Sequence, residues 1–480
     1  HTSLTFWKVA ASLSRLLLWL AMAAWVLFAV AWIVLHGVIV PRIGDFRPQL
    51  ETEASKALGV PVRIGAITAT SVGIIPSFEL QNVALLDGAG REALKLPRIL
   101  VAISPSSLLQ LSFEQLYIDQ PELEIRRAAD GKMFVAGLDF SKQDSNSGDA
   151  LDWFFSQPEF VIRNGTVRWV DEQPNGAMGV PPPLALSQVD FVSRNPFNKH
   201  LLRLDATPPP EWGERLSLRG VFTQSLLSPD KGKWRDWTGQ IYADFSKVDV
   251  SQLSRYVKFS SQFGRGVGAV RAWTSVAKGA WVSSTADVTL AQVDATLGEG
   301  LAPLSLLSMS GRLTGKQIKQ GFEFSTQNLQ FQTRDGLRWP GGNVFFSQTE
   351  PVGTVLGQGE FRADKLDLAA ISLIANRLPL GAATHAKLTS FAPQGVIQTV
   401  AANWRGNLDA PAAFTAKGQV TGLQVASQHS AVKLGTGVDM HEDIGRPGVS
   451  GAKVDFDVSM TGGKAKVLIE NGVVDVPGIF

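Results

Sequence analysis

Histidine and cysteine are the first residues to consider for chemistry, because imidazoles and thiolates bind metals and take part in catalysis. The chain has no cysteine, which excludes disulfides and thiolate metal sites. No two of the six histidines stand at the spacing of metal ligands, and these are His1, His36, His200, His385, His429 and His441. The sequence therefore predicts no metal site.

Two other stretches invite a chemical interpretation. GRGVGAV (264–270) is rich in glycine but lacks the Lys-Ser/Thr pair of a phosphate-binding loop, so we expect a loop before a strand. DFDV (455–458) alternates acids with apolar residues, which is typical of a strand with one wet face. Since no nucleophile, general base or oxyanion donor stands out, we expect no enzyme and no cofactor.

Composition narrows the choice of partners. The 480 residues carry a net charge of +2, so no basic field indicates nucleic acid. Charged residues make up only 18% of the chain, below the usual quarter. The 46 glycines and 25 prolines suit a fold with many turns.

VIRNGTVRWV (161–170) contains a slip in an alternating pattern. Phe160 and Ile162 are apolar at strand spacing, and so are Val167 and Trp169, but the two pairs are out of phase. A hairpin at Asn164-Gly165 would return all four to one face, and so would a bulge in one long strand. The pattern allows both.

The same slip occurs in three other segments. They are KVLIENGVVDV, with its own Asn-Gly, FEFSTQNLQF, with Phe322 and Phe324 before Leu329 and Phe331, and LYIDQPELEI. In the last, Pro121 is poorly placed for a type I turn, so we favour a bend. Keeping one apolar face through a change of direction is typical of long or curled antiparallel sheets.

An apolar run of twenty residues, Leu16 to Leu35, has the length of a bilayer core when helical. We interpret it as an uncleaved transmembrane anchor, because its small-residue pairs lie inside the run. The flanking lysines and arginines are nearly balanced and do not decide the orientation. The anchor residues that we single out are Leu16, Trp19, Trp25, Phe28, Trp32 and Leu35.

Beyond the anchor, short β-rich runs separated by turns predict a mainly β fold with few helices. Helices are expected at 46–58, 104–111, 249–257 and 366–378. The predicted organisation is a stub and anchor at 1–41, the start of a β-domain at 42–140, a polar linker or loop at 141–150 and an extended sheet at 151–480. The chain starts with His1 and ends in a strand-like pattern, so we expect an amino-terminal fragment.

A family resemblance extends over nearly the whole chain. The anchor followed by LGVPVRIGAITATSVGIIPSFELQNVALLD resembles the amino-terminal region of AsmA-like proteins. WFFSQPEFVIRNGTVRWVDE, DWTGQIYADFSKVDVSQLSRYV and LPLGAATHAKLTSFAPQGVIQTVAANWRG resemble the YhdP branch of that family. The individual motifs are weak, and their order is the specific signal.

The resemblance implies a protein with one inner-membrane helix and its bulk in the periplasm of a Gram-negative bacterium. It implies a long, curled, taco-like antiparallel β-groove that carries phospholipid toward the outer membrane, with outer-membrane or envelope proteins as partners of a missing carboxy-terminal part. The alternative is a membrane-tethered scaffold that regulates outer-membrane assembly without transport. On the groove interpretation, we expect these side chains to face lipid: Phe160, Ile162, Val167, Trp169, Phe322, Phe324, Leu329 and Phe331.

Overall fold

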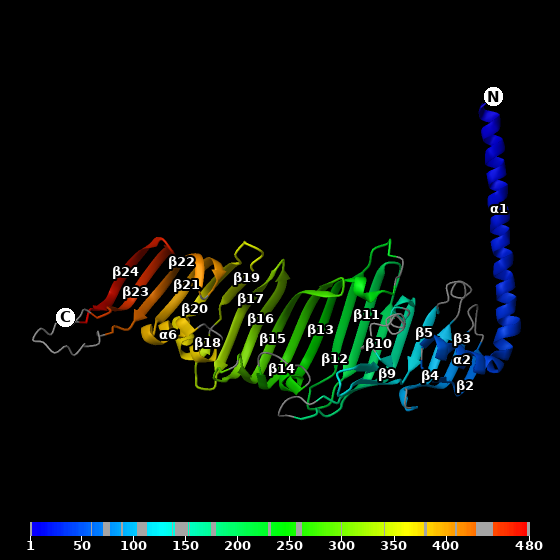
Figure 1. The fold of residues 1–480 in the computed structure, drawn as a ribbon, viewed down its shortest axis with the longest axis horizontal. Coiled ribbons are helices and arrows are strands. Elements are labelled where there is room, and N and C mark those ends of the chain that lie inside the picture. Colours follow the sequence, from blue (N-terminus) through cyan, green and yellow to red (C-terminus); the bar gives the residue numbers. More distant parts are fainter. Residues whose placement is uncertain are drawn as a thin grey trace, which may run out of the picture. The chain divides into compact units, whose positions relative to one another are not determined.

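The computed structural model confirms the mainly β fold, with one long amino-terminal helix before a large, almost entirely antiparallel sheet (Figure 1). It consists of two compact units, His1–Pro209 with Ser217–Trp237, and Pro210–Leu216 with Thr238–Phe480, called here the amino-terminal and the carboxy-terminal unit. The structure describes the chain except residues 1, 59, 71–76, 88–89, 103–112, 137, 140–151, 153, 174–178, 229–231, 256–261, 299, 340, 379–381, 409, 429–444 and 478–480.

Four helical segments open the chain: α1 (Thr2–Val34), the π-helical turn η1 (Leu35–Ile39), the 3-10 helix η2 (Val40–Phe46) and α2 (Arg47–Leu58). Within the described residues, one helical run, Ser14–Lys56, has a window long and apolar enough to cross a membrane. Leu16, Trp19, Trp25 and Phe28 are exposed along it. The run is therefore a candidate single-pass anchor.

The end of the predicted anchor is marked by a change of helix type. Trp32 stacks on His36 with ring centroids 4.0 Å apart, and Pro41 follows in the first turn of η2. Proline suits the first turn of a helix because its missing N–H has no intrahelical partner there. The side chain of Leu35, the last predicted anchor residue, lies outside the described residues.

The sheet of the amino-terminal unit is built around β3, β4 and β9. β3 pairs with β1 and β2 on one edge and with β4 on the other, and β4 pairs with β5 and β6. β9 then runs parallel to β5 and β6 and antiparallel to β10, which pairs with β11. The strands are β1 (Val62–Arg63), β2 (Ala66–Thr70), β3 (Ser77–Leu86), β4 (Glu92–Ala102), β5 (Gln115–Asp119), β6 (Glu122–Arg127), β7 (Met133–Val135), β8 (Leu138–Asp139), β9 (Glu159–Asp171), β10 (Leu184–Arg194), β11 (Lys199–Thr207) and β12 (Leu216–Thr223).

The carboxy-terminal unit is a simple antiparallel succession in which each long strand pairs with the next. The two-residue β18 is the exception, since it pairs only with the end of β17. The strands are β13 (Thr238–Asp249), β14 (Gln262–Ala277), β15 (Ala280–Thr296), β16 (Leu304–Ile318), β17 (Gly321–Thr333), β18 (Arg338–Trp339), β19 (Asn343–Thr349), β20 (Gln358–Asp367), β21 (Gln394–Asn407), β22 (Ala410–Val425), β23 (Gly448–Ser459) and β24 (Gly462–Asp475).

The slips in the alternating pattern are bulges. Asn164 lies inside the single strand β9 with φ of 51°, and Asn328 lies inside β17 with φ of 50°. Asn471 in β24 and Gln120 between β5 and β6 have the same left-handed backbone. The hairpin interpretation is therefore wrong, and the bulge interpretation is confirmed. Asparagine suits these positions because it tolerates positive φ better than most residues.

The helix predictions have mixed outcomes. The predicted helix at 46–58 is α2, and that at 366–378 is α5 (Leu368–Ile374) followed by the 3-10 turn η6 (Ala375–Arg377). The one at 249–257 is the 3-10 helix η5 (Val250–Arg255), whereas 104–111 lies outside the described residues, as does the linker at 141–150. The sequence did not predict the 3-10 turn η4 (Trp234–Asp236) or α6 (Ala382–Phe391).

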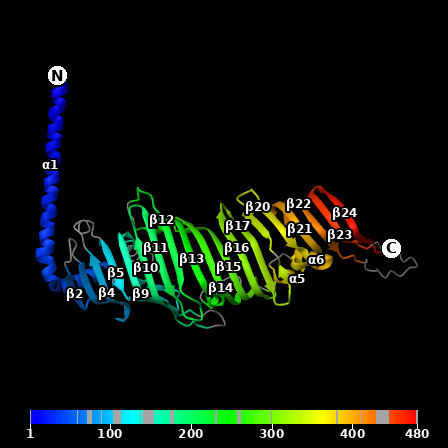
Figure 2. The same ribbon diagram turned by 180° about the vertical axis from the view of Figure 1, so that it is seen from behind.

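Helices α5 and α6 lie at one end of the neighbouring strands (Figure 2).

The glycine-rich stretch 264–270 is part of β14, so the predicted loop is wrong.

Candidate functional site

One apolar face runs through the bulge of β9. In the parallel pairing, Leu116 lies beside Phe160 and Ile118 beside Ile162; past the bulges of both strands, Leu123 lies beside Val167 and Ile125 beside Trp169. Paired residues on neighbouring strands share a face of the sheet. The bulge at Asn164 and the bend at Gln120 therefore keep the apolar side chains of both segments on one face.

The first half of this face is a closed core. Phe160 is 1% exposed and packs edge-on against Phe154 with ring centroids 3.8 Å apart. Ile162 and Phe191 are partly buried against the same cluster, whose fully buried members include Leu116 and Ile118. Val167 and Trp169 lie beyond the bulge and are partly exposed. Phe160 is therefore closed to any ligand, whereas Val167 and Trp169 keep some exposed surface.

In the carboxy-terminal unit the four predicted residues also share one face. Phe324 pairs with Phe346, which shares a face of β19 with Val344 two residues earlier. Val344 lines one apolar pocket together with Leu329 and Phe331. The bulge at Asn328 thus keeps both apolar pairs of β17 on the same side.

In β17 the residues before the bulge are the more exposed ones, whereas in β9 the residues after the bulge are. Phe322 and Phe324, before the bulge, are 50% and 40% exposed, while Leu329 and Phe331, after it, are partly buried. Phe346 bridges the open part, with ring centroids 5.7 Å from both Phe322 and Trp404. Phe322, Phe324 and Phe346, called here the exposed aromatic row, can contact an apolar ligand without any movement of the backbone.

The partly buried end of the face forms a pocket of about 600 Å³. Its lining is apolar throughout, with strands β14 to β19 on one side and helix α5 on the other. The lining residues are Val250, Val270, Val288, Leu290, Val293, Ala295, Leu297, Leu304, Leu306, Met309, Leu313, Leu329, Phe331, Trp339, Val344, Ile371, Ile374 and Leu378. Such a lining binds hydrocarbon and offers nothing to a charged group.

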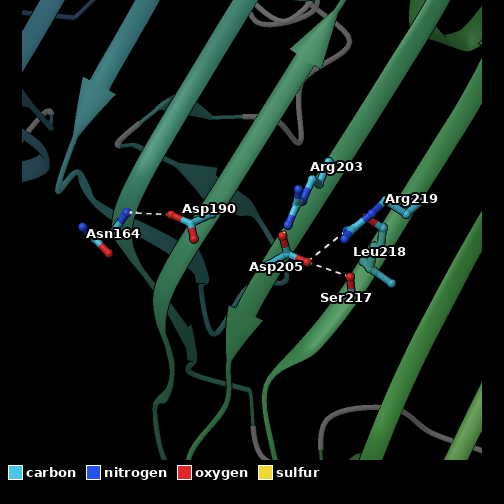
Figure 3. A network of polar contacts seen from close by, with 7 residues as sticks. All are labelled: Asn164, Asp190, Arg203, Asp205, Ser217, Leu218 and Arg219. Carbon is cyan, nitrogen blue, oxygen red and sulfur yellow. Dashed lines mark hydrogen bonds and ion pairs between the residues drawn. The ribbon is translucent and has the colours of Figure 1, made fainter.

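Polar side chains on the neighbouring strands accept hydrogen bonds from the backbone amides at the bulges. The backbone N–H of Asn164 donates to Oδ1 of Asp190 at 3.1 Å (Figure 3), and that of Asn328 donates to Oδ1 of Asn343 at 3.1 Å. Asn343 in turn donates through its own backbone N–H to Oδ1 of Asp364 at 2.9 Å. These acceptors satisfy amides that the interrupted ladder leaves free.

The most strongly bonded carboxylate is Asp205 on β11. It accepts hydrogen bonds from Ser217 at 2.6 Å, Arg203 at 2.6 Å and Arg219 at 2.9 Å (Figure 3). Burial raises the pKa of Asp205, but the bonds from Ser217, Arg219 and Arg203 outweigh it and lower the pKa to about 2. Local patterns do not indicate this cluster, because its members come from two strands.

The opposite face of the carboxy-terminal unit is polar and also hollowed. A depression of about 1120 Å³ has Arg362, Asp364, Lys417, Asp455 and Asp457 among its lining residues. DFDV, which the sequence assigned to a wet strand face, contributes both aspartates from β23. The unit is thus amphipathic, with charge on one side and hydrocarbon on the other.

Groups that could hold a metal are absent from the described part of the chain, where no three His, Asp or Glu side chains converge. Of the histidines, His200 is fully buried and stacks on Trp237 with ring centroids 3.7 Å apart. It therefore has a packing role in the amino-terminal unit.

The comparison with protein families agrees with the order of motifs along the chain. The family model described as YhdP protein matches residues 5–480. The chain belongs to the YhdP family. A search of curated proteins found no match. Membership of the YhdP family, together with the apolar helix and the apolar sheet face, indicates an envelope protein related to lipid transport.

Proposed function

We propose that this YhdP-family chain conducts phospholipid along the apolar face of its sheet. On this proposal, α1 anchors the chain in the inner membrane of a Gram-negative bacterium and the sheet lies in the periplasm. Lipid moves toward the outer membrane, where envelope proteins or the membrane itself receive it. The observation that supports the proposal most is the apolar face of the carboxy-terminal unit, which continues past the bulge of β17 and widens into the pocket of about 600 Å³.

The energetics explain why such a face is needed. Two acyl tails of about 16 carbons each cost roughly 25 kcal/mol to transfer into water, at about 0.8 kcal/mol per CH₂. A continuous apolar face removes most of this cost along the path. Exposed rings such as Phe322 and Phe324 give weak, replaceable contacts, which suit movement better than tight binding.

Transport of this kind requires no bond to be made or broken. The proposal therefore includes no catalytic residue, no cofactor and no nucleic acid. The partners are phospholipid and the two membranes of the envelope.

A matched pair of substitutions tests the proposal against a non-transporting scaffold. Phe324 and Ser325 are consecutive residues of β17, so their side chains lie on opposite faces. Phe324→Glu places a charge on the lipid face, and Ser325→Glu places the same charge on the polar face. Delivery of labelled phospholipid from inner to outer membrane is followed by pulse-chase, and thermal unfolding is measured for both purified proteins.

We expect Phe324→Glu to slow delivery by about tenfold or more, since a carboxylate in an apolar path is costly to desolvate. We expect Ser325→Glu to transport normally. Equal transport by the two variants at equal stability would contradict the proposal and favour the scaffold.

A further inference from the structure

Helix α5 lines one side of the pocket through Ile371 and Ile374, and Leu378, which also lines it, follows the turn η6. The segment Leu368–Arg377, called here the cover segment, begins with an N-cap in which Asp367 Oδ1 accepts from the N–H of Ala370 at 3.0 Å. Ile374 is buried with Val293, Leu304 and Leu306 on the sheet. Leu373, next to it in the chain, is 67% exposed and lies on the outer side of the same helix.

Contacts at its carboxy-terminal end and in its middle hold the cover segment in place. At its carboxy-terminal end, Arg377 donates to Asp335 at 2.8 Å, and the carbonyl of Asn376 accepts from the N–H of Ala302 at 3.2 Å. In the middle, Ser372 Oγ contacts the carbonyl of Pro393 at 3.4 Å. The first two contacts join the segment to the turns that follow β17 and β15, so releasing them frees its end from the sheet.

The lining and the volume of the pocket are suited to one kind of ligand. Water is poorly stabilised there, because every lining residue is apolar. An empty space of about 600 Å³ would leave the lining atoms without packing partners, and the size lies within the range of ligand-binding cavities. A flexible hydrocarbon chain fits these constraints, whereas a lipid headgroup would leave its polar atoms unsatisfied.

We propose that this pocket is a discrete binding site for a single acyl chain, and that the cover segment must release its end for the chain to enter or leave. The inference rests on the proposed function and adds a fixed holding position to it. The exposed aromatic row carries chains past freely, while the covered pocket retains one. The headgroup of a bound phospholipid stays outside.

Photolabelling of the full chain in nanodiscs tests the site. One arm uses phosphatidylethanolamine vesicles with a diazirine in one palmitoyl chain, and the other uses the free diazirine palmitate. Labelled residues are mapped by mass spectrometry. We expect labels on pocket residues such as Met309, Phe331 and Ile371 and none on Leu373, and the arm that labels them identifies the source of the chain.

The outcomes separate this inference from the proposed function. Labels at Phe322 and Phe324 with none in the pocket would overturn the holding site and leave the lipid-conducting face in place. Labels on neither set would overturn both. Equal labels on Leu373 and Ile371 would also overturn the site, because they would show contact without enclosure.

A reversible crosslink tests the cover. The chain has no cysteine, and the hydrogen bond from the N–H of Ala302 to the carbonyl of Asn376 makes these two positions the choice for a disulfide between the segment and the sheet. In the double variant Ala302→Cys/Asn376→Cys, we expect oxidation to slow pocket labelling by about tenfold, which corresponds to about 1.4 kcal/mol, and reduction to restore it. The single variant Ala302→Cys controls for oxidation alone. Unchanged labelling in the oxidised double variant would overturn the role of the cover segment.

Discussion

Strands β9 and β17 carry the same sequence pattern in different surroundings. Each has two apolar pairs separated by a bulge at an asparagine with φ near 50°. In β9 the first aromatic residue, Phe160, is enclosed by Phe154 and Phe191, whereas in β17 the corresponding Phe322 has Phe346 beside it and half of its surface exposed. The pattern therefore determines which face a side chain lies on, and segments distant in the sequence determine whether that face is closed or open.

The largest expected effect tests this difference directly. Phe160→Ala removes a fully enclosed ring and should cost about 3–5 kcal/mol of unfolding free energy. Phe322→Ala removes a half-exposed ring and should cost about 1 kcal/mol or less. Urea unfolding of the two variants measures both values. Equal losses would mean that the two faces are packed alike.

The second effect concerns the hydrogen bonds to Asp205 that join β11 and β12 of the amino-terminal unit. The pKa of Asp205 is lowered from 3.8 to about 2 in the folded chain, so its ionised form should stabilise the fold by about 2 kcal/mol above pH 4. This contribution should be lost as the pH falls from 4 to 2. Asp205→Asn should therefore be less stable than the unchanged chain at pH 7 and approach its stability at pH 2. A difference that is constant with pH would contradict the assigned bonds.

The third effect compares the two bulges. Asn164→Ala and Asn328→Ala should each cost about 1 kcal/mol, because alanine tolerates positive φ poorly. The cost should be similar in both, since it arises in the backbone and not from burial. Asn164→Gly and Asn328→Gly are the controls and should lose less. Thermal unfolding measures the losses. A much larger loss for Asn164→Ala than for Asn328→Ala would show that the cost depends on packing around the strand and not on the backbone.

The smallest effect concerns the acceptor on the neighbouring strand. Asp190→Ala removes the partner of the Asn164 amide and should cost about 0.5–1 kcal/mol, because water can reach this exposed amide. Hydrogen exchange at Asn164 should become faster, while exchange at Asn328 stays unchanged. Equal acceleration at both bulges would show that the substitution acts on the whole sheet.

Much of this arrangement could be predicted from the sequence. The apolar run predicted the helix α1. The change of phase in β17 predicted a common face for Phe322, Phe324, Leu329 and Phe331. The choice between hairpin and bulge could not be made, because Asn-Gly suits the positive φ of either. The capping position of Asp367 indicated a helix, but its cover of the pocket depends on contacts with Ala302 and Asp335 that are distant in the sequence.

Two further features gave no usable signal. The residues of α6 show little segregation of apolar and polar positions, so periodicity did not reveal this helix. The parallel pairing of β9 with β5 and β6 joins segments more than thirty residues apart, and strand order cannot be deduced from local patterns. The family and the amphipathic sheet are therefore predictable, whereas the degree of enclosure along the sheet is not.

The central claim is that lipid contacts one face of the sheet and follows it through the bulges. A photoreactive residue placed in turn at every position of β17 from Phe322 to Phe331 tests this in cells, with phospholipid adducts as the readout. We expect adducts at 322 and 324, then at 329 and 331, so that the alternation changes phase at Asn328. Adducts that keep one phase through the bulge, or that appear equally on both faces, would contradict it.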